Sequence, residues 1–220
     1  MDGMIENGFA TYAIDLRGYG ATPRDSTGWL TPNKAAKDVS VVLAWISKRH
    51  NQKVHLFGWS FGSTVSLLTT LNYPDNIKTL TVFGFWMDLD QEIPMIKFHE
   101  PQRKKNTAEA AASDFITPGS ISQKAIDRYV EMALQSDPVR TDLSQMDQYN
   151  AIDPSKIEHP VLILQGEFDP IAPSKYQAKL FNRLKSSKKS WIVIPGGDHA
   201  AFMEKPRNYF IRVFSQFLLD

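Results

Sequence analysis

Residues 58–62 read Gly-Trp-Ser-Phe-Gly and fit the pattern G-x-S-x-G. The apolar run 53–57 precedes them and a helical pattern follows, so Ser60 falls on a tight turn between a strand and a helix. Such a turn strains the serine backbone and lifts its Oγ clear of the sheet, while the flanking glycines permit close packing. The N-terminus of the next helix and the backbone N–H of Phe61 can then stabilise an oxyanion. The pattern predicts that Ser60 is a nucleophile for acyl transfer.

A serine hydroxyl becomes a good nucleophile only when a base takes its proton. His199 follows the apolar run 190–194 and a glycine-rich loop, from which an imidazole can reach across the edge of a sheet. His50 instead ends a predicted helix, and His55 lies within a predicted strand. We therefore expect His199 to be the base.

The base in turn needs a carboxylate that orients it. Asp169 comes shortly after the apolar run 161–165, which places it on the same carboxyl edge of a parallel sheet as Ser60 and His199. Three other carboxylates lie on nearby loops and remain alternatives: Glu167, Asp198 and Asp88. Asp169 is the preferred acid, and the chain order is then nucleophile, acid, base.

The elements that must position these residues follow an alternating pattern. Short apolar runs rich in β-branched or aromatic residues alternate with longer segments of helical period, which predicts a parallel sheet flanked by helices. Strands are expected over 10–15, 53–57, 77–83, 161–165 and 190–194. Helices are expected over 33–49, with Asn33 as the N-cap, and over 60–71, 174–184 and 207–219.

The alternation is interrupted between Met87 and Asn150. Charged and polar residues predominate there, prolines punctuate the segment, and helical patterns cover 108–115 and 124–134. We interpret this segment as an inserted helical cap. The predicted domain organisation is a first part of the core at 1–86, the cap at 87–150 and a second part of the core at 151–220.

Four motifs in this order resemble those of the α/β-hydrolase superfamily. Residues 15–20 resemble the loop after the fourth strand, 58–62 the nucleophile elbow, 166–169 the acid turn and 197–199 the histidine loop. The resemblance covers essentially the whole chain. It implies a three-layer α/β/α sandwich with a mostly parallel sheet and a helical cap over the active site.

The resemblance also implies a cofactor-free serine hydrolase that cleaves an ester or related acyl bond of a small molecule through an acyl-enzyme, with no metal site. A serine at the elbow makes dehalogenase or epoxide hydrolase activity unexpected, since those relatives use an aspartate there. In the family picture, Trp59, Phe61 and Trp86 line an acyl pocket; their alternative role is that of core aromatics.

The chain departs from the family at its beginning. Family members carry three strands before the segment that starts here, and the third ends in a loop that donates a second oxyanion N–H. Residues 2–8 resemble the last turns of the family's first helix. We expect an N-terminally truncated hydrolase whose first strands are missing; in the alternative, strands 10–15 and 53–57 pair directly. The alternative function is that of a non-catalytic or severely impaired fragment that acts as a binding module.

Composition excludes several other classes. The 220 residues include 25 Lys and Arg against 24 Asp and Glu, so the strong positive field of a nucleic-acid-binding protein is absent. The lack of cysteine excludes thiol nucleophiles and Cys-ligated metals.

Gly18-Tyr19-Gly20 lacks the third glycine of a dinucleotide-binding loop, and Pro23 takes the position of that glycine. No apolar run approaches the ~20 residues of a membrane span, and no secretory signal opens the sequence, so a cytoplasmic location is expected.

Overall fold

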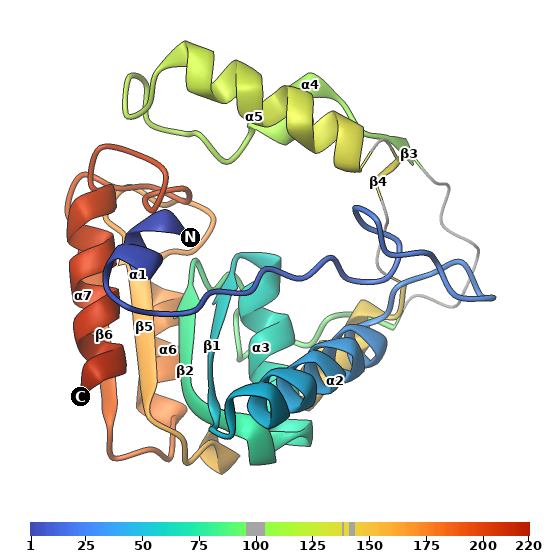
Figure 1. The fold of residues 1–220 in the computed structure, drawn as a ribbon, viewed down its shortest axis with the longest axis vertical. Coiled ribbons are helices and arrows are strands. Elements are labelled where there is room, and N and C mark those ends of the chain that lie inside the picture. Colours follow the sequence, from blue (N-terminus) through green and yellow to red (C-terminus); the bar gives the residue numbers. More distant parts are fainter. Residues whose placement is uncertain (96–103, 138, 141–143) are drawn as a thin grey trace.

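The computed structural model describes residues 1–95, 104–137, 139–140 and 144–220. Its main sheet contains four parallel strands, β1 (Val54–Trp59), β2 (Ile77–Phe83), β5 (Val161–Gly166) and β6 (Lys189–Ile194), in the order β1-β2-β5-β6 (Figure 1). Trp59 pairs with Phe83, and Phe83 pairs with Leu164. This register aligns the carboxyl ends of neighbouring strands, so the loops that follow them meet at one edge of the sheet.

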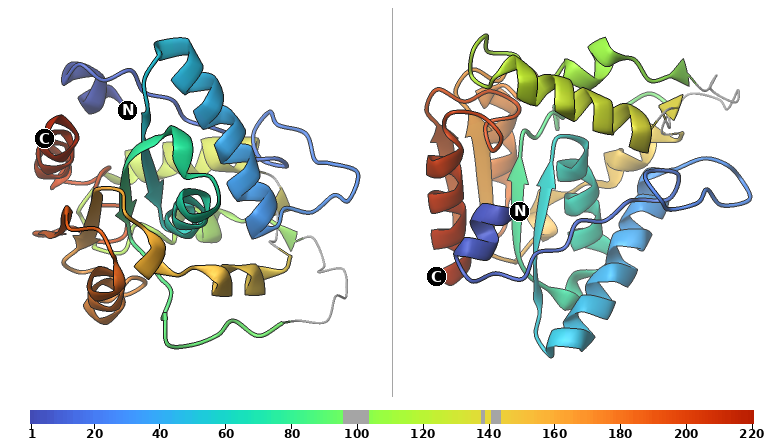
Figure 2. Two further views of the ribbon diagram at one scale, coloured as in Figure 1. Left: turned by 90° about the horizontal axis from the view of Figure 1, so that it is seen from below. Right: turned by 45° about the horizontal axis from the view of Figure 1, so that its top comes forward.

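Helices cover both faces of the sheet. α2 (Pro32–His50), α3 (Phe61–Asn72) and α6 (Ser174–Arg183) lie on one face, whereas α1 (Asp2–Glu6) and α7 (Arg207–Leu219) lie on the other (Figures 1 and 2). Leu67 and Leu180 belong to the core cluster on the first face, and Phe210 and Phe214 to the cluster on the second. The predicted three-layer α/β/α sandwich is confirmed.

Helix α2 begins earlier than predicted. Thr31, rather than Asn33, is the N-cap: its backbone is extended and its hydroxyl accepts a hydrogen bond from the Lys34 N–H at 3.3 Å. Pro32 occupies the first helical position, where its fixed φ suits the helix and its missing N–H costs no hydrogen bond. The proline therefore moves the start of the helix to residue 32.

The strand predicted over residues 10–15 is wrong. These residues form no ladder with any described strand, and β1 lies at the edge of the sheet. Side chains hold the segment instead: the Phe9 ring packs edge-on against His55 at 6.2 Å, and the Tyr12 ring packs against Trp45 at 6.0 Å. An extended segment becomes a strand only through backbone hydrogen bonds to a partner. The alternative of direct pairing with β1 is therefore not observed.

Residues 87–150 hold α4 (Ala108–Ala112), α5 (Gln123–Ser136) and an antiparallel pair of short strands, β3 (Lys104–Lys105) and β4 (Val139–Arg140). α4 and α5 lie beyond the carboxyl ends of the main strands (Figures 1 and 2). Three 3₁₀ helices complete the described chain: η1 (Pro74–Asn76), η2 (Met146–Ala151) and η3 (Pro154–Lys156). Among the described helices, none is long and apolar enough to cross a membrane.

Candidate active site

Ser60 occupies the sharp turn between β1 and α3, as predicted. Its φ of 52° and ψ of −120° place a non-glycine residue in a strained conformation, and its N–H donates to the Phe83 carbonyl at 2.9 Å. A Cβ on Gly58 would lie 2.1 Å from the Gly62 carbonyl oxygen, so this position requires glycine. Gly62 has open space where a Cβ would project, so close packing does not explain the second glycine.

The three predicted side chains lie in a hydrogen-bonded row. Ser60 Oγ is 2.7 Å from His199 Nε2, and His199 Nδ1 is 2.8 Å from Asp169 Oδ2. The side chains of His199 and Asp169 are fully buried. The second carboxylate oxygen of Asp169 accepts the backbone N–H groups of Ile171 and Ala172 at 2.9 and 3.1 Å. These bonds fix the carboxylate and thereby the imidazole, which is placed to take a proton from Ser60.

The alternative acids face other groups. Glu167 accepts the Gly196 N–H at 2.8 Å, and Asp88 pairs with Lys179, which lowers the pKa of the Asp88 carboxyl. Asp198 accepts backbone N–H groups of residues 116 and 117. Among the four candidates, Asp169 is the one that reaches the His199 ring in the described structure.

His199 is also held through its backbone and through close packing of the loops. The Trp59 indole N–H donates to the His199 carbonyl at 2.6 Å, and the Trp59 ring packs edge-on against Phe202 at 4.8 Å. A Cβ on Gly84 would lie 2.8 Å from His199 Cε1, and one on Gly166 would lie 2.2 Å from the Asp198 carbonyl oxygen. The two glycines therefore allow the loops after β2 and β5 to approach the histidine loop closely.

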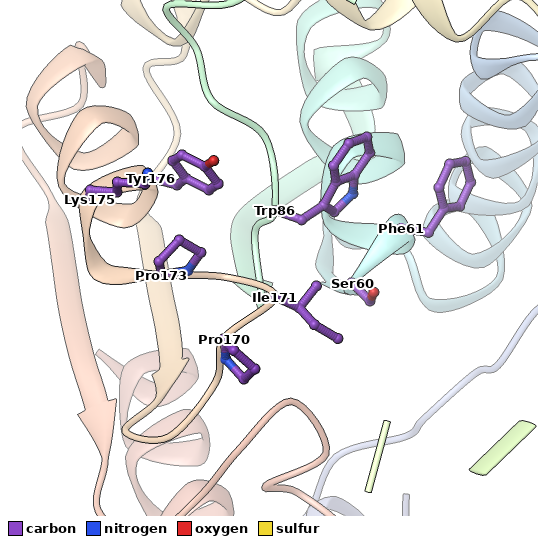
Figure 3. Close-up of a pocket in the computed structure, with 8 residues that line it drawn as sticks. All are labelled: Ser60, Phe61, Trp86, Pro170, Ile171, Pro173, Lys175 and Tyr176. Atoms are coloured by element: carbon purple, nitrogen blue, oxygen red, sulfur yellow. The ribbon is translucent and has the colours of Figure 1, made fainter. Parts of the chain in front are cut away.

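A pocket of about 710 Å³ opens beside Ser60 (Figure 3). The residues that line it are Ser60, Phe61, Trp86, Pro170, Ile171, Pro173, Lys175 and Tyr176. Phe61 and Trp86 were expected there, whereas Trp59 is not among the lining residues and lies under the histidine loop instead. The wall formed by residues 170–176 was not predicted from the sequence. Their position directly after the acid turn, at the carboxyl end of β5, was the signal that could have found them.

The pocket wall formed by residues 170–176 carries a positive charge, that of Lys175. Lys175, in the first turn of α6, lies with its amine 5.0 Å from the centroid of the Tyr176 ring (Figure 3). It is the one charged residue among the eight described lining residues. The rest of the lining is largely apolar, so the pocket suits an uncharged group next to the serine.

A parallel sheet with a strained serine after one strand, an acid after another and a histidine on a third loop defines an α/β-hydrolase, and that prediction is confirmed. The family model of the serine aminopeptidases, S33, matches residues 1–206, and the chain belongs to this family. It is therefore a hydrolase.

Named relatives and solved structures are similar at lower identity. The pimeloyl-[acyl-carrier protein] methyl ester esterase of Aeromonas salmonicida is 24% identical over 95% of this chain and 88% of its own length. The 2-(acetamidomethylene)succinate hydrolase of Mesorhizobium japonicum is 23% identical over 89% of this chain and 73% of its own length. The crystal structure of the monoacylglycerol lipase of Paleococcus ferrophilus has a TM-score of 0.64 and 22% identity, and covers 94% of this chain and 82% of that one.

Proposed function

We propose that this protein hydrolyses small carboxylic esters through an acyl-enzyme on Ser60. The observation that carries the proposal is the row of hydrogen bonds from Ser60 through His199 to Asp169 at the mouth of the pocket, with Ser60 itself part of the lining. In an ester hydrolase the same three groups supply the nucleophile, the base and the carboxylate that orients the base.

The reaction follows from the positions of these groups. Ser60 Oγ attacks the ester carbonyl while His199 takes its proton, and Asp169 stabilises the imidazolium that forms. The Phe61 N–H, at the N-terminus of α3, faces the same turn and donates to the oxyanion. His199 then protonates the departing alcohol. Water, deprotonated by the same histidine, releases the acid and restores Ser60.

The charge of the pocket supports esters over peptides with a free amino terminus. Such a peptide needs an acidic or carbonyl-rich site for its ammonium group, yet none of the eight described lining residues is acidic and Lys175 would repel a cation. One relative is named as a methyl ester esterase, which fits an uncharged ester. Phe61, Trp86 and Ile171 offer apolar surface to its acyl group.

Residues 87–150 form the cap in this proposal. Helices α4 and α5 lie beyond the strand ends that carry Ser60 and His199 (Figure 2). Their placement supports a role in limiting which acyl groups reach the pocket, since side chains brought over an active site exclude water and large substrates.

Active-site labelling tests the proposal. A fluorophosphonate probe is expected to label the wild type, to fail on Ser60→Ala and to label Ser187→Ala, which changes an exposed serine away from the site, as well as the wild type. The wild type is also expected to hydrolyse p-nitrophenyl acetate faster than alanine p-nitroanilide. A well-folded wild type that neither reacts with the probe nor hydrolyses the ester would favour the binding module instead.

A further inference from the structure

Two buried carboxyl groups lie between β6 and α7, in residues 195–206, which include the histidine loop 197–199, and have no part in the proposed reaction. Asp198 is 0% exposed and Glu204 is 4% exposed. Burying a carboxylate is costly unless hydrogen bonds or a cation compensate it. Neither side chain forms a salt bridge within the part of the chain that the structure describes. The compensation must therefore come from hydrogen bonds, and these lead to the cap.

The carboxylate of Asp198 forms hydrogen bonds both to the cap and to the residue that follows His199. Its Oδ2 accepts the backbone N–H groups of Ile116 and Thr117 at 3.0 and 2.5 Å. Its Oδ1 accepts the N–H of Ala200 at 3.0 Å. Asp198 and Ala200 are the neighbours of His199 in the chain, so any displacement of residues 116–117 pulls on the backbone at both sides of the base.

Glu204 extends the same contact. Its Oε1 accepts the Ser120 hydroxyl at 2.6 Å, and its Oε2 accepts the Asp198 N–H at 3.4 Å. The Lys205 N–H donates to the Ser120 carbonyl at 3.0 Å. Ser120 is itself buried. The cap turn at residues 116–120 is thus held by three groups: the side chains of Asp198 and Glu204 and the backbone N–H of Lys205.

The surroundings of Glu204 raise the pKa of its carboxyl group. Burial raises the pKa of Glu204 most, and the charge of Asp198 and a hydrogen bond shared with its side chain raise it further, whereas the hydrogen bonds from the Ser120 hydroxyl and the Asp198 N–H lower it. The two carboxyl groups therefore interact directly as well as through the Asp198 N–H.

We infer that Asp198 and Glu204 form a latch that fastens the cap turn 116–120 to the histidine loop, and that Asp198 is a positioning residue for His199. The kinetic part of this inference, the positioning of His199, rests on the proposed function. Asp198 and Glu204 have different roles in this latch. Asp198 affects the reaction through the backbone of His199. Glu204 affects access to the pocket through Ser120 and the cap.

Kinetics with two esters separate the two roles. Asp198→Asn keeps the size of the side chain but turns an N–H₂ group toward one of its backbone donors, and is expected to lower kcat for p-nitrophenyl acetate about tenfold with little change in KM. Ser120→Ala leaves the neighbours of His199 untouched, so its effect is expected on KM for p-nitrophenyl octanoate. Asp153→Asn is the matched control, because Asp153 accepts the Ser155 N–H on η3, outside the site.

Hydrogen–deuterium exchange on the same proteins reports the latch without the reaction. The amides of residues 116 and 117 are expected to be protected in the wild type and in Asp153→Asn, and to exchange faster in Asp198→Asn and Ser120→Ala. Amides 116 and 117 that exchange as fast in the wild type as in Asp198→Asn would overturn the latch. An unchanged kcat for the acetate in Asp198→Asn would overturn the positioning role. A wild type inactive on both esters would instead refute the proposed function, and the exchange result would still decide the latch.

Discussion

Gly84 permits a sharp test of how precisely the base must be placed. The residue follows β2 with a φ of +66°, and a Cβ there would lie 2.8 Å from His199 Cε1 and 3.0 Å from His199 Nδ1. Ordinary van der Waals contact of a Cβ atom begins at 3.4 Å. In Gly84→Ala the His199 imidazole must therefore move by about 0.6 Å. This ring is fully buried among close-packed atoms, so the movement disturbs its contacts.

The expected consequence is a loss of rate. The imidazole bridges Ser60 at 2.7 Å and Asp169 at 2.8 Å, and a displacement of this size spoils the geometry of one or both bonds. Misplacement of reacting groups by about 1 Å can cost roughly 10²-fold in rate. We therefore expect kcat of Gly84→Ala to fall between tenfold and 100-fold on p-nitrophenyl acetate, with a smaller change in KM.

Gly8→Ala is the matched control for this test. Gly8 also has a positive φ, +87°, but a Cβ on this residue would meet no atom within 4 Å, and Gly8 follows α1, away from the site. A left-handed alanine costs about 1–2 kcal/mol in either variant. Thermal unfolding should thus show a loss of stability in both variants, larger in Gly84→Ala by the cost of the clash, about 1–3 kcal/mol, while only Gly84→Ala loses kcat. Equal kcat values in the two variants would refute the steric reasoning.

Three further predictions concern the groups around the base and one distant histidine. Asp169→Asn is expected to lower kcat by about 10⁴-fold in continuous ester assays, because the amide no longer stabilises the imidazolium; a loss below tenfold would show that another acid serves His199. Trp59→Phe removes the indole bond to the His199 carbonyl and should lower kcat about five- to tenfold, with near-normal ring packing against the loop and little change in thermal stability. Burial and the charge of Lys78 lower the pKa of His55 to about 4, so the native state resists protonation there. The unfolded chain binds that proton near pH 6.5, so the free energy of unfolding should decrease as pH falls from about 6.5 to about 4, and denaturant titrations of His55→Asn should show a weaker decrease.

Much of the framework could be predicted because its signals are local. The turn at Ser60 shows in five consecutive residues, and strand β2 and helix α7 begin and end at the predicted residues. The alternation of apolar runs with helical patterns is then enough to predict the layered parallel sheet. The spacing of the apolar residues in each element shows which of its faces is buried. The error at Asn33 was also local, because Pro32 starts the helix.

Other features depend on partners that are distant in sequence. Residues 10–15 have the composition of a strand, but strand formation requires a neighbouring backbone that the described sheet does not offer them. Trp59 has an aromatic side chain beside Ser60, and this position suits a pocket wall equally well. Its hydrogen bond to the His199 carbonyl spans 140 positions of the sequence, and no pattern around residue 59 indicates it.

The sequence by itself indicated the turn that carries Ser60, the order of the candidate residues and the layered fold, because these follow from short patterns and from the period of each element. Only the tertiary structure decided which of four carboxylates reaches His199, which residues form the far wall of the pocket and what Asp198 and Glu204 contact. All three depend on how loops from different strands pack at one edge of the sheet. Loop packing is set by contacts between residues up to 140 positions apart, such as Trp59 with His199, which the order of residues along the chain does not specify.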